Sequence, residues 1–166
     1  YEITGSYAAL GLVGLAGAVP MLLLSVFGGV VADRMPKKTV MQLGQGASLI
    51  NAAAMAVLVF TGLMNLPWLL LTAGLQGIVM ALMMPSRQAM LPEIVGLERM
   101  MNAVSLNMAG MNSMRLFAPA LGGFIVGIFG FGWAFSTMAL LYLGAVIAMA
   151  QVPWRPAAAP NNDGMS

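Results

Sequence analysis

The chain has 166 residues, of which 60% are hydrophobic and 7% are charged, whereas an ordinary soluble domain carries about 25% charged residues. Seven basic and five acidic side chains cannot coat a protein of this size with a solvated surface. This excludes an ordinary cytosolic enzyme, a disordered linker and a nucleic-acid-binding protein. Because the sequence contains no Cys and no His, a disulfide framework, a thiol nucleophile, a Cys/His zinc site and a His general base are excluded too. Composition therefore predicts a polytopic membrane protein in contact with the lipid bilayer.

Clusters of charge divide the sequence into five apolar segments, each long enough to cross the bilayer as a helix, which takes about 20 residues. The predicted spans are about 6–31, 39–61, 68–84, 101–128 and 133–152. Continuous runs rich in Leu, Ala, Gly and Met favour helices over barrel strands, which are about ten residues long and alternate in polarity. The predicted fold class is an all-α membrane protein with five transmembrane helices.

The two ends of the chain carry predictions of their own. Residue 1 is Tyr, and no charged segment precedes the first apolar run, so we expect a piece whose natural start lies upstream rather than a signal peptide. Residues 1–152 are predicted to form one helical bundle. Residues 153–166, which contain three prolines, are predicted to form a solvated linker.

The basic residues predict how the helices are oriented. Six of the seven lie in 32–38, 85–99 and 153–166, whereas the turns at 62–67 and 129–132 carry no charge. Five spans place the first three segments on one side of the membrane and the two turns on the other. By the positive-inside rule, the charged segments and the C-terminal tail are cytoplasmic. We therefore expect a multi-pass protein of the cell's inner (plasma) membrane.

The acidic residues do not assemble an obvious catalytic group. All of them lie in loops, in tails or at the end of a span: Glu2, Asp33, Glu93, Glu98 and Asp163. No basic or nucleophilic partner accompanies any pair of them at a plausible depth. We expect no enzymatic activity, no cofactor, no metal site and no nucleic-acid partner.

The most informative stretch follows the first span. Its small and charged positions are Gly29, Asp33, Arg34, Lys37 and Lys38, with Pro36 forcing a sharp turn. One interpretation is a positive-inside anchor, although the acid Asp33 weakens such an anchor. The stretch resembles the signature loop between helices two and three of the major facilitator superfamily, where Pro36 stands in place of the usual glycine. The resemblance implies that these five positions form the cytoplasmic signature loop.

A second resemblance lies in the fourth span. This span resembles the end of the antiporter motif in helix five of the same superfamily. The matching positions are Arg115, Pro119, Gly122 and Gly123, and Ala118 replaces one glycine of the motif. Pro119 frees a backbone carbonyl and kinks a helix. Gly122, Gly123 and Gly127 allow a neighbouring helix to pack closely, which would seal one side of a transporter. Ordinary helix packing is the alternative interpretation.

A third stretch, from Pro85 to Glu93 and on to Arg99, resembles the loop between helices four and five in the superfamily's drug and siderophore exporter branch. That branch contains the enterobactin exporter and macrolide efflux proteins. Residues 1–6 resemble its link into helix two. The resemblance implies that the five spans are helices two to six of twelve. Helix one and the C-terminal half would then be missing partners of this chain, and 153–166 would begin the cytoplasmic linker.

The function implied is secondary active transport by alternating access, with export of small amphipathic molecules such as drugs or siderophores. Protons are one candidate driving ion. The alternative is a non-transporting membrane fragment or partner subunit that acts only by helix packing.

Arg115 is the one ionisable residue deep in a predicted span. It lies about 14 residues, or roughly 21 Å, from Met101, near or beyond the middle of a core about 30 Å thick. A charge there costs at least ~2.5–3.5 kcal/mol, so it should face a cavity or a charged partner. Asn112, Met108 and Met111 share its helix face and complete a candidate substrate cavity. A structural ion pair and simple gap-filling by Met are the alternatives.

Polar side chains in the second and third spans are weaker candidates. Gln45 is included in the candidate cavity, and the other polar residues of these spans are Gln42, Asn51 and Gln76. Such groups either line a cavity or bridge helices by hydrogen bonds worth about 0.6 kcal/mol each. Bridging is the interpretation we favour for them.

Overall fold

A computed structural model describes residues 7–95 and 100–151, with the side chains of 26–34 and 91–95 left out of the description. This part of the chain forms five helices: α1 (Tyr7–Arg34), α2 (Lys37–Phe60), α3 (Leu66–Val95), α4 (Met100–Phe129) and α5 (Phe131–Gln151). All five are long and apolar enough to cross a membrane. The predicted fold class is therefore confirmed.

Proline and asparagine set where α2 and α3 begin. Pro36 lacks a backbone N–H and disfavours helical geometry at Met35, so α1 stops before it and α2 starts after it. Asn65 caps α3, because its side-chain Oδ1 accepts a hydrogen bond from the backbone N–H of Trp68 at 3.2 Å. Pro36 and Asn65 thus mark the starts of α2 and α3.

Two glycines with positive φ make the tight turns after α2 and α4. Gly62 has φ 69° and Gly130 has φ 85°, a left-handed geometry that other residues adopt at a cost. After Gly62, the N–H of Leu63 donates to the carbonyl of Leu58 at 3.1 Å, which satisfies an otherwise unpaired group at the end of α2. Backbone hydrogen bonds close these turns, so neither turn needs a charged side chain.

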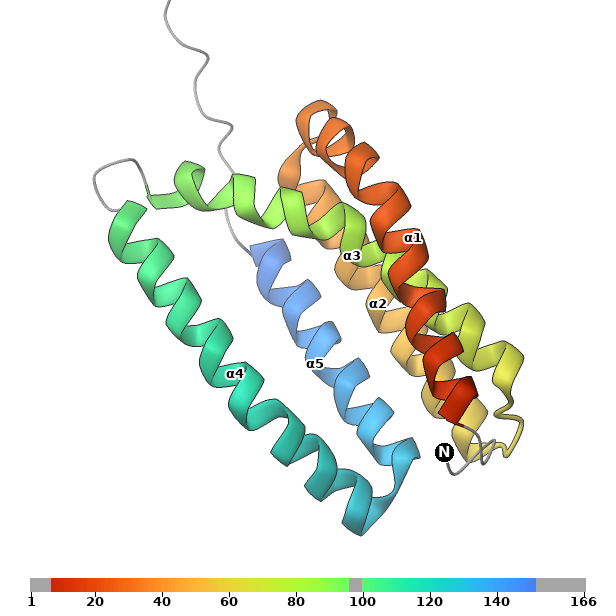
Figure 1. Ribbon diagram of the computed structural model, residues 1–166. Coiled ribbons are helices and arrows are strands. Elements are labelled where there is room, and N and C mark those ends of the chain that lie inside the picture. Colours follow the sequence, from red (N-terminus) through yellow and green to blue (C-terminus); the bar gives the residue numbers. More distant parts are fainter. Residues whose placement is uncertain (1–6, 96–99, 152–166) are drawn as a thin grey trace, which may run out of the picture.

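The two uncharged turns lie at the same end of the bundle, near the start of α1 (Figure 1). The α1–α2 connection, the end of α3, the start of α4 and the end of α5 lie at the opposite end. The helices therefore alternate in direction as the charge pattern requires. Which end faces the cytoplasm stays a prediction.

Glycines bring α1 and α3 into backbone contact. A Cβ atom at Gly77 would overlap the carbonyl oxygen of Gly17 and lie 2.9 Å from its carbonyl carbon. A Cβ atom at Gly17 would lie 3.2 Å from the carbonyl oxygen of Ala73. Small residues allow membrane helices to approach this closely, and α1 and α3 are the most extensively packed pair.

A polar network joins α2, α3 and α5. The Nδ2 of Asn51 donates to the carbonyl of Thr72 at 3.1 Å and to the Oε1 of Gln76 at 3.3 Å. The Nε2 of Gln76 donates to Ser48 Oγ at 3.3 Å and to the Tyr142 hydroxyl at 3.5 Å. Asn51 and Gln76 therefore bridge helices, as predicted, and satisfy each other inside an apolar bundle.

α4 is packed very differently from the other helices. It contains no buried residue, and Leu106 and Leu116 are 76% and 77% exposed. It lies at one side of the bundle and packs sparsely, on α5 and α3 (Figure 1). An apolar helix of 30 residues is thus left with most of its surface uncovered by the described residues.

The third helix is longer than its sequence suggests. The spacing of charges predicts a span that ends at Met84 and a loop from Pro85, but α3 continues to Val95. Pro85 has no N–H to donate to the carbonyl of Ala81, four residues earlier, yet the helix continues through it. In the next position, Ser86 Oγ donates to the carbonyl of Leu82 at 3.1 Å. α3 changes direction between its two halves, and Pro85 lies in the second half (Figure 1).

Candidate functional site

The signature positions divide between described and undescribed side chains. Gly29, Asp33 and Arg34 belong to the last turns of α1, and their side chains lie outside the described residues. Lys37 and Lys38 form the first turn of α2 rather than a loop. Lys38 Nζ donates to the carbonyl of Ala150 at 3.4 Å, close to the C-terminus of α5. A cation there also interacts favourably with the helix dipole, so Lys38 ties the α1–α2 connection to the end of α5.

The glycines of the helix-five motif lie on an open surface. A Cβ atom at Gly122, Gly123 or Gly127 would have no neighbouring heavy atom within 4 Å, apart from its own helix. Pro119 lies inside α4, which continues through it for ten more residues to Phe129. No described helix therefore packs closely against this motif. The close approach that the glycines were expected to provide occurs elsewhere, between Gly17 and Gly77.

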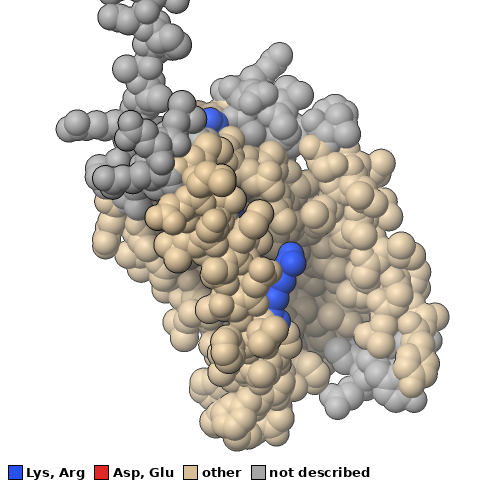
Figure 2. All heavy atoms as spheres, turned by 60° about the vertical axis from the view of Figure 1, so that its left-hand side comes forward, with Lys and Arg blue, Asp and Glu red and all other residues tan. Residues whose placement is uncertain are grey.

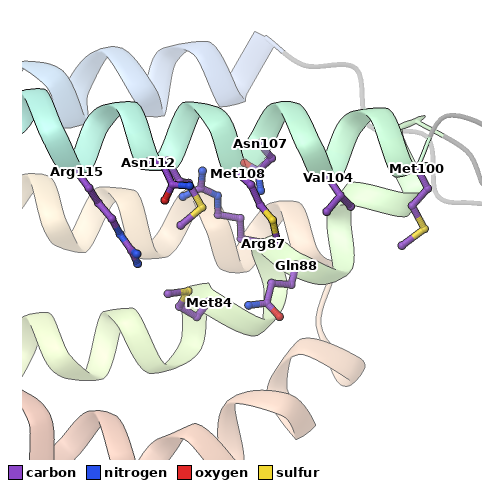
Figure 3. Close-up of a pocket in the computed structure, with 10 residues that line it drawn as sticks. Met84, Arg87, Gln88, Met100, Val104, Asn107, Met108, Asn112 and Arg115 are labelled. Carbon is purple, nitrogen blue, oxygen red and sulfur yellow. The ribbon is translucent and has the colours of Figure 1, made fainter.

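A cavity of about 520 Å³ lies between α3 and α4. Its lining residues are Met84, Arg87, Gln88, Met100, Val104, Asn107, Met108, Met111, Asn112 and Arg115. In Figure 3, Arg115 extends from α4 toward α3, while Arg87 extends from α3 toward α4 beside Asn112. The volume falls within the range of about 300–1,000 Å³ that is usual for small-molecule sites.

The structure brings together most of the residues that were expected to line a cavity. Asn112, Met108, Met111 and Arg115 all contribute to the cavity between α3 and α4. Gln45, on α2, is not among its lining residues, and its Oε1 atom is buried without a hydrogen-bond partner among the described residues. The face of α4 that carries Arg115 is thus a cavity wall.

Sequence reasoning missed the wall that α3 contributes. Arg87 and Gln88 were assigned to a loop because the cluster of charges in 85–99 predicted the end of the span, whereas both lie on α3. On α4, Val104 and Asn107 were also missed. Continuing the spacing of Met108, Met111 and Arg115 by one turn toward the N-terminus would have found them.

The cavity is basic within the described part of the chain. Its charged lining residues are Arg87 and Arg115, and no hydrogen bond or ion pair to a described residue holds either guanidinium. The five acidic residues all lie outside the described side chains. In Figure 2, one basic side chain lies beside a hollow and a second basic group lies near the upper edge, on a face whose other described residues are almost all uncharged.

Arg115 is the sixteenth of the 30 residues of α4, so it lies at the middle of the helix. Charged groups at this depth face a cavity or a partner, and here the described surroundings are a cavity. The lining amides, thioethers and guanidinium groups can bind and orient a ligand, but they offer no nucleophile or general base at neutral pH. The arrangement suits reversible binding.

Comparison with known proteins places the chain in a family. Residues 1–163 match the MFS_3 family, which is described as transmembrane secretion effector. The chain is 31% identical over 139 residues to the staphyloferrin A transporter of Staphylococcus aureus, across 83% of this chain and 35% of that protein. It is 27% identical over 149 residues to the uncharacterized MFS-type transporter YfiS of Bacillus subtilis, across 87% of this chain and 32% of that protein.

The chain spans about a third of the length of the curated relatives it matches. No solved structure matches it. The family match covers all five helices and both walls of the cavity. The chain therefore belongs to the transmembrane secretion effector family of the major facilitator superfamily.

Proposed function

We propose that this chain is part of a secondary active transporter that exports small amphipathic molecules by alternating access. The observation that carries the proposal is the cavity between α3 and α4, which holds Arg115 at the middle of a spanning helix. A structural role alone would not require a small-molecule-sized space around a charge at that depth. In major facilitator transporters such sites lie near the bilayer midplane.

The relatives support the substrate class and the direction. One is named as a transporter of staphyloferrin A, and the family is described by secretion. The four Met residues of the cavity provide a polarisable and adaptable wall that suits varied apolar ligands. Drugs and siderophores, moved outward, are therefore the proposed cargo, and protons are the candidate driving ion.

Uneven packing supports alternating access. The pairs α1–α3 and α2–α5 are closely packed, whereas α4 contains no buried residue. A helix that must contact a moving half of the transporter in one state and release it in another needs a face that its own half leaves uncovered. The missing helix one and C-terminal half are its proposed partners. The charged ends and the tail are proposed to face the cytoplasm of the cell's inner membrane.

Transport in inside-out membrane vesicles tests the function. The full-length protein that carries this chain should accumulate a fluorescent amphipathic dye inside such vesicles, and a protonophore should abolish the accumulation if protons drive it. Asp33→Asn, in the signature loop, should lower transport while the amount of protein in the membrane stays near normal. Accumulation no greater than in empty vesicles would contradict the proposal, and accumulation confined to right-side-out vesicles would reverse the direction.

The exposure of α4 also favours a second candidate, a non-transporting fragment or partner subunit that acts by helix packing. In that case the chain would co-purify with another membrane protein through α4. Bulky substitutions at Gly123, which has open space around it, would disrupt that association without any effect on dye flux.

A further inference from the structure

We infer that the cavity between α3 and α4 selects an anionic amphiphile, a molecule that presents two oxyanion groups, carboxylate or phosphate, on an apolar body. The inference rests on the proposed transport function, for which it names the substrate class. Its basis is the placement of two guanidinium groups, Arg87 and Arg115, on facing walls of one cavity.

The two arginines lie at different depths. Arg115 is at the middle of α4, whereas Arg87 is the twenty-second of the 30 residues of α3 and lies nearer the end of its helix, close to the charged segment that follows. The side chains extend from opposite helices into the same space (Figure 3). A ligand with two acidic groups could therefore contact one arginine near the membrane boundary and the other deep in the bilayer.

The charges of the described lining favour an anion in this space. Two positive charges in a region of low dielectric constant repel each other, and none of the described lining residues carries a negative charge. A dianion cancels both charges as it enters. The planar guanidinium fork binds a carboxylate or phosphate group through two parallel hydrogen bonds, which a Lys ammonium does not reproduce.

The rest of the lining explains why the ligand should also be apolar. Met84, Met100, Met108 and Met111 contribute thioether side chains, which pack against varied apolar shapes. A second cavity, of about 690 Å³, shares Arg87, Asn107, Met111 and Arg115 with the first, so the arginines border a larger apolar space. A small hydrated inorganic anion would leave most of this surface without a partner.

A matched pair of probes tests the inference by binding alone. N-dansyl-glutamate carries two carboxylates, whereas its diamide has nearly the same shape and no charge. Dansyl fluorescence rises in an apolar site, so both probes can be titrated into the full-length protein purified in neutral detergent. The dianion should bind at least about tenfold more tightly than the diamide, because each charge-assisted contact contributes about ten- to a hundredfold in affinity.

Arg115→Gln and Arg87→Gln should each lower the affinity for the dianion by about ten- to a hundredfold and leave the affinity for the diamide unchanged. Arg155→Gln is the matched control. It also removes one positive charge, but its position in the sequence is outside α3 and α4. Two separate arginines keep the test decisive if one variant fails to fold. An anion preference that survives both substitutions, or that is absent from the unmodified protein, would overturn the inference.

Two rival occupants give different results. If either arginine variant is unstable and Glu93→Gln or Glu98→Gln restores it, with no preference for the dianion, the arginines are members of structural ion pairs and the inference is wrong. Repeating the titration in phosphatidylcholine and phosphatidylglycerol nanodiscs tests for a lipid. Arginine-dependent displacement of the dianion by phosphatidylglycerol alone would assign the site to a lipid headgroup and also overturn the inference.

Failure of this inference can be told from failure of the transport function. Flux of the neutral diamide without any anion preference would support the transport function and contradict the anionic substrate class. Conversely, arginine-dependent binding of the dianion without flux of any probe would support the anion site and contradict the proposed transport function.

Discussion

At the scale of single residues, Gly77 determines how closely α3 approaches α1. Gly77→Ala should destabilise the protein by about 1–3 kcal/mol, because the new methyl group overlaps the backbone of Gly17, which cannot move aside as a side chain can. The measurement is the thermal unfolding midpoint in detergent. Gly74→Ala is the control on the same helix, since its Cβ would lie 3.5 Å from the carbonyl oxygen of Ala16, an ordinary contact. Equal midpoints for the two variants would contradict the backbone contact.

Gln76 holds the polar network between three helices. Gln76→Leu should lower the free energy of unfolding by about 2 kcal/mol, because it removes hydrogen bonds to Asn51, Ser48 and Tyr142 that are worth about 0.6 kcal/mol each in membrane proteins. Gln42→Leu is the matched control, since the side chain of Gln42 forms no hydrogen bond with a described residue. Denaturant titration of both variants checks the difference. A loss of the same size in the control would show that the network itself contributes little.

The roles of individual residues were predicted unevenly. Arg115, Asn112, Met108 and Met111 could be grouped from sequence because helical spacing alone places them on one face. Gln45 could not be assigned in this way, because the direction a polar side chain takes depends on the helix it meets. For the same reason the glycines in close contact, Gly17 and Gly77, look no different in sequence from Gly122 and Gly123, which no other described helix approaches closely.

At the scale of helices, apolar length and charge were sufficient for four of the five elements. α1, α2, α4 and α5 begin and end within three residues of the predicted spans. α3 was predicted too short because the charges of 85–99 were used to end it, whereas charge marks the end of an apolar span and not the end of a helix, which here continues through Pro85 to Val95. Inside a bilayer an unfolded turn would expose more unpaired backbone groups than one proline removes. That error also hid Arg87 and Gln88, which lie on the α3 side of the cavity.

The turn between α4 and α5 depends on one left-handed residue. Gly130→Ala should cost about 1–2 kcal/mol, because Gly130 has φ 85°, where a Cβ atom approaches the following carbonyl. Gly127→Ala, one turn earlier and with open space around it, should be close to neutral or slightly stabilising. Comparing thermal unfolding midpoints separates the two. A neutral Gly130→Ala would mean that the turn can relax into another geometry.

At the scale of the whole molecule, single cysteines can report which end faces the cytoplasm. The sequence contains no Cys, so each introduced thiol is the one reactive site in this chain. Asn65→Cys and Gly130→Cys should react with a membrane-impermeant maleimide in intact cells, whereas Lys37→Cys should react only after permeabilisation, because the uncharged and charged ends are opposite. Labelling of Asn65→Cys and Lys37→Cys from the same side would refute the five-span arrangement.

The contact between Gly17 and Gly77 has a thermodynamic consequence for the order in which the bundle comes apart. Two backbones that touch directly restrict no side-chain rotamers, so the glycine part of the contact between α1 and α3 loses almost no side-chain entropy. The wall between α3 and α4 is lined by Met, whose three flexible torsions make ordering costly, by up to about 1.5–2 kcal/mol per side chain. Because an entropic cost grows with temperature, warming should loosen α4 from α3 well before it separates α3 from α1.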